Sequence, residues 1–221
     1  MLKEFVKQEA RPLPVLLLLD VSGSMDGEKI DSLNQAVKEM VKDFGNEEST
    51  KTEIHLAIVT FGGEARLHTD LMSVKNIEYK DIVANGYTPL GGALDIAKEL
   101  VENKEKITSR SYRPSVILVS DGSPNDMGWE RKMNSFINEG RSSKCDRWAL
   151  AIGADADEHM LKTFINDPEK KLFKTEDAGG ISKFFKFITM STTSRTKSDN
   201  PNVVSKEIMN IDPFKDEIFE F

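Results

Sequence analysis

Short apolar segments alternate along the chain with longer segments in which apolar residues recur every three or four positions. The first apolar segment, Leu13 to Leu19, is a continuous run, which is typical of a strand buried on both faces of a parallel sheet. Between Glu28 and Phe44 the apolar residues have the spacing of one helix face. This alternation predicts an α/β fold in which helices cover both sides of a mostly parallel sheet.

The same pattern continues to about residue 190. It predicts further strands at 54–61, 65–69, 116–120, 147–152 and 172–174, and helices at 90–101, 126–139, 158–165 and 181–188. Gly62 and Gly63 separate two of these strands and favour an antiparallel return. Pro89 suits the first position of a helix, and Thr88 before it suits the N-cap.

The pattern divides the chain into a domain at 1–190 and a C-terminal segment at 191–221. That segment starts with a Ser/Thr cluster, contains two prolines and ends in acidic and aromatic residues. We therefore expect a flexible linker followed by an acidic, aromatic tail. The tail would dock on its own domain or be disordered, or it would bind a partner or mediate self-association.

Composition narrows the range of partners. The 221 residues carry 30 Lys and Arg against 37 Asp and Glu, a net charge of −7, so nothing global attracts nucleic acid or an anionic membrane. Cys145 is the single cysteine, which excludes an internal disulfide and fits a reducing compartment. The densest apolar run, Val15 to Leu19, is too short to span a bilayer, and the N-terminus lacks the apolar stretch of a signal peptide. We expect a cytoplasmic protein in which Cys145 is a small buried residue.

Five oxygen-bearing residues stand where three predicted loops meet strands or helices. Asp20, Ser22 and Ser24 follow the first strand, Thr88 precedes a helix, and Asp121 follows the strand at 116–120. Any one of them alone could cap a helix or form a turn. In open α/β sheets, however, ligands gather beyond the carboxyl ends of strands where the strand order reverses. Carboxylates and hydroxyls without histidine or cysteine suit a hard divalent cation such as Mg²⁺.

These residues resemble the site of a known family. Asp20-Val21-Ser22-Gly23-Ser24 is similar to the DxSxS motif of von Willebrand factor type A domains, and Thr88 and Asp121 stand where that family completes its metal-ion-dependent adhesion site. The resemblance covers about residues 13 to 190. It implies a Rossmann-like three-layer αβα fold with a six-stranded, mostly parallel sheet, whose antiparallel edge strand would be Ala65 to Thr69.

The resemblance also implies how a metal would be held. Ser22 and Ser24 would be direct ligands, whereas Asp20, Thr88 and Asp121 would bind directly or through water. The ion would be Mg²⁺, with Ca²⁺ or Mn²⁺ as alternatives.

Three further stretches are similar to a bacterial cytoplasmic branch of the family that is associated with tellurium resistance and stress response. They are Tyr112-Arg113-Pro114, the run from Asp121 to Asp126, and Phe184-Phe185-Lys186-Phe187. This likeness implies a place in a stress-response or defence assembly.

Two classes of function fit the predicted site. In the first, the protein is a non-catalytic interaction module, and an acidic side chain of a protein partner completes the coordination of the metal. Met25, Tyr87 and Trp129 lie next to the ligand loops in sequence and could form the rim of the partner surface, or they could serve ordinary packing. The alternative is a metal-dependent phosphatase or other hydrolase, because a buried strand that ends in Asp also opens haloacid-dehalogenase phosphatases. Those enzymes need a second Asp where this chain has Ser22, so the interaction module is the preferred interpretation.

Overall fold

A single sheet is built from six strands: β1 (Arg11–Asp20), β2 (Thr52–Gly62), β3 (Glu64–Ser73), β4 (Ser115–Ser120), β5 (Asp146–Ile152) and β6 (Phe173–Thr175). They are seen in a computed structural model that describes residues 10–47 and 49–215. The strand order is β3-β2-β1-β4-β5-β6. Only the β2–β3 pair is antiparallel; the other four pairs are parallel. The predicted six-stranded sheet with one antiparallel edge strand is confirmed, although β3 is longer than expected.

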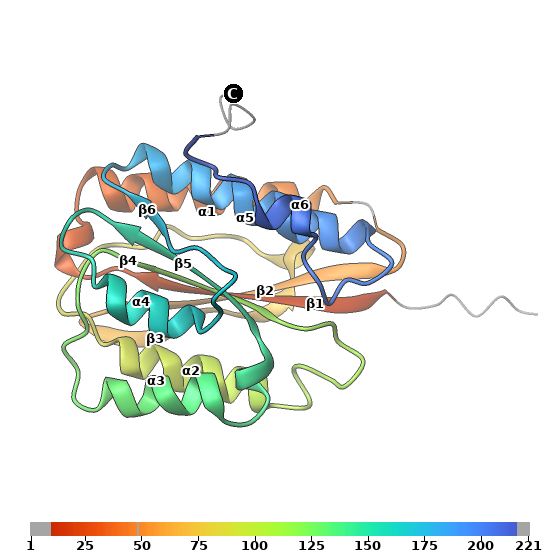
Figure 1. Ribbon diagram of the computed structural model, residues 1–221, viewed down its shortest axis with the longest axis horizontal. Helices are drawn as coiled ribbons and strands as arrows, with labels where there is room; N and C mark the ends of the chain where they lie inside the picture. The colour runs from red at the N-terminus through yellow and green to blue at the C-terminus, as the bar shows by residue number, and fades with distance from the viewer. Residues whose placement is uncertain (1–9, 48, 216–221) are drawn as a thin grey trace, which may run out of the picture.

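Helices cover the sheet on both faces. They are α1 (Glu28–Gly45), α2 (Leu90–Glu102), α3 (Trp129–Asn138), α4 (Glu158–Ile165), α5 (Gly179–Lys197) and α6 (Lys206–Met209). Figure 1 shows α1, α5 and α6 on one face and α2, α3 and α4 on the other. This is the three-layer α/β arrangement that the sequence predicts. None of the helices in the described part of the chain combines the length and apolarity needed to cross a bilayer.

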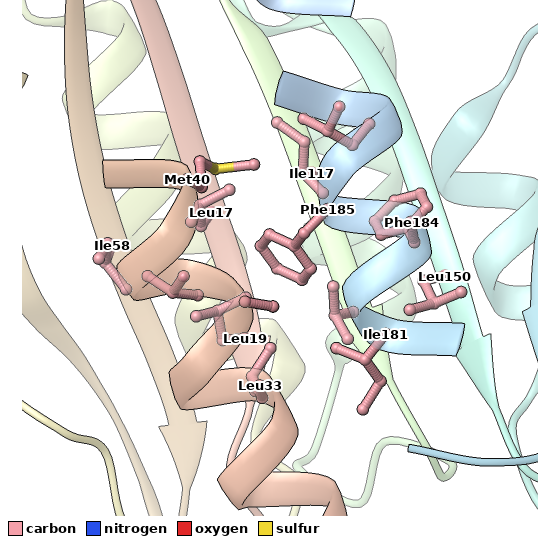
Figure 2. Close-up of a cluster of buried hydrophobic side chains, with 14 of the residues drawn as sticks. Leu17, Leu19, Leu33, Met40, Ile58, Ile117, Leu150, Ile181, Phe184 and Phe185 are labelled. Atoms are coloured by element: carbon pink, nitrogen blue, oxygen red, sulfur yellow. The ribbon is translucent and has the colours of Figure 1, made fainter. Parts of the chain in front are cut away.

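The apolar run of β1 contributes to two separate cores. Leu17 and Leu19 belong to the cluster under α1 and α5, and Leu16 and Leu18 belong to the cluster under α2, α3 and α4. Figure 2 shows part of the first cluster, in which Phe185 points from α5 toward α1. Because successive side chains of a strand point to opposite faces, a central strand between two helical layers must be apolar at every position.

Helix α5 corrects one expectation. Residues 191–197, expected to start a flexible linker, are the last turns of α5. The hydroxyls of the Ser/Thr cluster bond back to carbonyls of the preceding turn, as in Thr193 Oγ1 to Thr189 O at 2.9 Å. Serine and threonine within a helix satisfy their own hydroxyls in this way, so the cluster continues the helix where composition suggests a break.

The segment after α5 packs on its own domain as far as residue 215. Pro201 and Pro213 are buried, and the ring of Phe214 lies 6.2 Å from that of Phe173 in β6. The acidic end of the expected tail, residues 216–221, lies outside the described residues.

Arg195 fastens this segment to the sheet. Its side chain is 1% exposed, and its guanidinium donates to Pro201 O at 2.6 Å, Ser115 Oγ at 2.6 Å and Arg113 O at 2.7 Å. Burial lowers the pKa of Arg195 to about 10, so the group stays charged at neutral pH. One buried cation therefore ties the end of α5 to the start of β4.

We expect Arg195→Ala to lower the free energy of unfolding by about 3 kcal/mol, because it leaves buried acceptors without donors. Urea denaturation of the full chain measures this change. Arg131→Ala removes an exposed guanidinium from α3 and should change stability by less than about 0.5 kcal/mol. Equal midpoints for the two variants would contradict the fastening role of Arg195.

Candidate metal centre

The two predicted carboxylates meet where the strand order reverses. Asp20 is the last residue of β1, and Asp121 directly follows β4, its parallel neighbour. The chain adds β2 and β3 on one side of β1 and then β4 on the other, so the strand order reverses between β1 and β4. The structure therefore places Asp20 and Asp121 at the adjacent ends of two neighbouring parallel strands.

The loop after β1 turns its two serines toward each other. The Ser22 amide donates to Asp20 Oδ1 at 2.9 Å, and Ser22 Oγ lies 3.0 Å from Ser24 Oγ. Ser24 Oγ in turn donates to Asp121 Oδ1 at 2.7 Å. Four of the five predicted ligands thus form one connected hydrogen-bonded group.

Asp20 is a buried carboxylate without a cationic partner among residues 10–47 and 49–215. It is fully buried, and Ser120 Oγ donates to its Oδ2 at 2.6 Å. Burial raises the pKa of Asp20, and the hydrogen bonds from Ser120 and Ser22 oppose that shift. An ionised carboxylate in this position is costly unless a cation compensates it, so the environment of Asp20 favours a bound metal ion.

The spacing of the oxygens fits a small hard cation. Adjacent ligands of an octahedral Mg²⁺ ion, at bond lengths of about 2.1 Å, lie about 3.0 Å apart. The two serine hydroxyls already have this 3.0 Å separation. Ser24 is exposed, whereas Asp20, Ser22 and Asp121 are buried, so the group is open to solvent on one side only.

The loop that carries Thr88 is hydrogen-bonded to the loop after β1 and to the turn between β2 and β3. Gly86 O accepts from the Gly23 amide at 2.9 Å, which brings this loop beside the serines. Gly86 has a φ of +69°, and a Cβ there would lie 2.6 Å from Gly63 Cα, so the contact requires glycine. Thr88 itself is 7% exposed. Within the described chain its hydroxyl makes no hydrogen bond to the other four predicted ligands; its backbone alone is tied down.

The role expected for Thr88 as a helix cap is wrong. Helix α2 begins at Leu90 and follows Pro89, and its first amides are satisfied by a different residue. Asp126 accepts from the Gly91 and Gly92 amides, each at 3.1 Å. The helix expected at 126–139 is α3, which starts only at Trp129. Asp126 lies in the loop before α3, where it binds the first amides of α2.

Lys29 is part of the site and was not predicted. It lies in the first turn of α1, and its ammonium donates to Asp121 Oδ2 at 2.6 Å and to Ser24 O at 3.2 Å. A cation near a helix N-terminus is unfavourable unless an anion compensates it. The position of Lys29 at the predicted helix start was therefore a usable signal for a nearby carboxylate.

Two more contributors, Ser120 and Asn125, were also missed. Ser120 bonds Asp20 across the two strands, and Asn125 joins the Thr88 loop to the loop after β4. The Thr88 amide donates to Asn125 Oδ1 at 3.0 Å, and the Asn125 amide donates to Thr88 O at 3.2 Å. Adjacency to Asp121 pointed to Ser120, whereas no local pattern distinguished Asn125.

Of the three residues expected at the rim, only Tyr87 is exposed. Tyr87 is 76% exposed beside Thr88, but Met25 is fully buried, and Trp129 is partly buried against the core under α2 and α3. Met127, which was not predicted, is 97% exposed on the loop that contains Asn125. Tyr87 and Met127 therefore flank the two joined loops.

Cys145 has the role that the sequence predicts. It is 1% exposed, and burial raises the pKa of its thiol to about 12. Such a thiol is almost wholly protonated at neutral pH and behaves as a small apolar side chain.

A family model described as von Willebrand factor type A domain matches residues 15–187. Among curated proteins, inter-alpha-trypsin inhibitor heavy chain H4 of Sus scrofa is 31% identical over 123 residues, which cover 52% of this chain and 13% of that protein. Heavy chain H2 of Homo sapiens is 24% identical over 216 residues, which cover 90% of this chain and 22% of that protein. The chain thus spans less than a quarter of the length of these relatives.

Solved structures show the same fold. A von Willebrand factor type A protein from Catenulispora acidiphila has a TM-score of 0.64 at 20% identity, and the match covers 82% of this chain and 43% of that one. Proximal thread matrix protein 1 from the mussel byssus, solved with a zinc-occupied MIDAS motif, has a TM-score of 0.62 at 16% identity. That match covers 84% of this chain and 48% of the mussel protein.

We expect Ser120→Ala to weaken divalent metal binding about tenfold, because the Ser120 hydroxyl donates to Asp20 Oδ2 and so fixes the orientation of this carboxylate. Isothermal titration with Mn²⁺ measures the dissociation constant. Ser123→Ala, an exposed serine of the same loop, is the matched control and should bind like the unmodified chain. A Ser120→Ala protein with unchanged affinity would show that this hydrogen bond does not support the metal centre.

Proposed function

The chain belongs to the von Willebrand factor type A domain family, and we propose that it is a non-catalytic protein-interaction module. In this role the metal centre receives an acidic side chain from a protein partner. The observation that carries the proposal is the pair of serine hydroxyls 3.0 Å apart, buried on the side of the two carboxylates and open on the side of Ser24.

The residues present fit a divalent cation. Ser22 and Ser24 would hold it directly, and Asp20, Thr88 and Asp121 would hold it directly or through water. A bound ion would supply an electrophilic position for a carboxylate oxygen from outside. The zinc-occupied motif in the mussel protein supports the proposal that a divalent ion binds here. Mg²⁺ is the proposed physiological ion because every donor is a hard oxygen.

The same group is a poor hydrolase. Both oxygens of Asp20 already accept hydrogen bonds, one from the Ser22 amide and one from Ser120. The position that supplies the acid in haloacid-dehalogenase phosphatases is Ser22, whose hydroxyl points to Ser24. Asp20 is thus held as a ligand and has no general acid two residues along to serve it as a nucleophile.

The surroundings of the centre suggest what kind of partner binds. Tyr87 and Met127 expose apolar side chains on two loops that Thr88 and Asn125 join by two hydrogen bonds. Exposed apolar side chains beside a polar site often anchor the binding of a protein partner. We therefore propose a partner segment in which an acidic residue is flanked by apolar side chains.

Some parts of the proposal rest on the sequence alone. A place in a bacterial stress-response or defence assembly, near proteins of tellurium resistance, is supported by the three stretches that resemble that branch. A cytoplasmic location is supported by the single cysteine. Self-association through the C-terminal end stays a prediction, because residues 216–221 lie outside the described residues.

We expect Asp20→Ala to abolish both Mn²⁺ binding and metal-dependent partner capture. Titration measures the first, and capture on immobilised protein with and without EDTA measures the second. The fold should persist, since the substitution removes a buried charge; circular dichroism checks this. A partner held equally by both proteins in EDTA would refute the metal bridge. Metal-dependent turnover of a generic phosphomonoester, lost in Asp20→Asn, would favour the hydrolase instead.

We expect the double substitution Tyr87→Ala and Met127→Ala to weaken partner binding about tenfold and to leave Mn²⁺ affinity unchanged. Surface plasmon resonance with the captured partner measures the binding. Val203→Ala is the control, since Val203 is also exposed but lies between α5 and α6, far from the metal loops in sequence. The partner would lie elsewhere if the double variant bound it as tightly as the Val203→Ala protein.

A further inference from the structure

Lys29 contacts the metal centre through two different residues. Its ammonium lies 2.6 Å from Asp121 Oδ2 and 3.2 Å from Ser24 O, and its side chain is 33% exposed. The partner carboxylate of Asp121 is 0% exposed. The ammonium is therefore not a solvated surface charge that meets a carboxylate by chance, because one member of the ion pair is wholly buried.

The contact divides the two oxygens of Asp121 between two donors. Ser24 Oγ occupies Oδ1, and Lys29 occupies Oδ2. Asp121 consequently turns only one oxygen toward the serines and cannot chelate an ion with both. Asp20 has no such cation beside it in the described part of the chain, so the charge of Lys29 acts on one side of the site.

The charges of the group follow from these contacts. Two carboxylates and one ammonium leave the centre with a single net negative charge, and a divalent ion would then leave it with a single net positive charge. Without the ammonium, the same ion would make the centre neutral. We propose that Lys29 sets the charge of this centre: it weakens the binding of the ion and keeps the loaded centre cationic, so that it selects an anionic partner group. This inference rests on the proposed metal site.

Lys29→Met tests the proposal, because it keeps the length of the side chain and removes the charge. We expect Mn²⁺ to bind Lys29→Met about tenfold more tightly than the unmodified chain, as measured by titration calorimetry. We expect acetate to bind the Mn²⁺-loaded variant several-fold more weakly, as measured by the loss of water-proton relaxation when acetate displaces a coordinated water. A merely structural lysine would not shift the two affinities in opposite directions.

Two variants serve as controls. Lys29→Arg keeps the charge and should behave like the unmodified chain in both measurements. Lys38→Met removes an ammonium from the same helix, where it pairs with exposed Asp81 at 2.8 Å, and should change neither affinity. Thermal unfolding of all four proteins checks that each is folded.

The outcomes separate the two proposals. Mn²⁺ binding to the unmodified chain, with equal or weaker binding to Lys29→Met, would overturn the role of Lys29 and leave the metal site standing. No Mn²⁺ binding to any of the four folded proteins would overturn the metal site, and the role of Lys29 with it. Tighter metal binding with unchanged acetate binding would overturn the part of the proposal that concerns partner selection.

Discussion

Strand β1 lies between β2 and β4 with a helical layer on either face, and this position determines most of what surrounds it. Its side chains from Leu13 to Leu19 are all apolar, because alternate residues enter two different cores. The sheet grows away from β1 in both directions, so the chain leaves its end on one side and returns on the other. At this point of reversal, polar side chains can gather without interrupting either core.

Two carboxylates are buried at this point, and the surrounding groups compensate the charge of each in a different way. Asp20 accepts hydrogen bonds from an amide and a hydroxyl, and no cation pairs with it in the described part of the chain. Burial raises its pKa, and the two hydrogen bonds oppose that shift. Asp121 receives a hydroxyl and the ammonium of Lys29. A divalent ion would complete the compensation of Asp20. The positive charge of Lys29 therefore lies on the Asp121 side of the site, and the negative charge of Asp20 is not paired with a cation in the described part of the chain.

Much of this could be predicted from local patterns. The run at Leu13 to Leu19 indicated a strand buried on both faces, and the two glycines at 62 and 63 indicated the antiparallel return of β3. The spacing of Asp20, Ser22 and Ser24 indicated a ligand loop. Errors arose where a residue serves a distant element. Thr88 looked like a cap, but Asp126 caps α2 from 35 residues away. The Ser/Thr cluster looked like a linker, but Arg195 beside it is fixed by Ser115.

The sequence alone was sufficient to predict the class of fold, the order of most elements and four oxygen-bearing residues that the structure joins by hydrogen bonds, because hydrophobic period, turn residues and donor chemistry are local properties. The sequence alone did not predict the contacts of Lys29, Ser120 and Asn125, because these contacts depend on which loops become neighbours in the fold. It also left open how the charge of Asp121 is balanced. Contacts between residues about 90 to 100 positions apart exist only once β1 and β4 pair, since that pairing alone brings the two loops together.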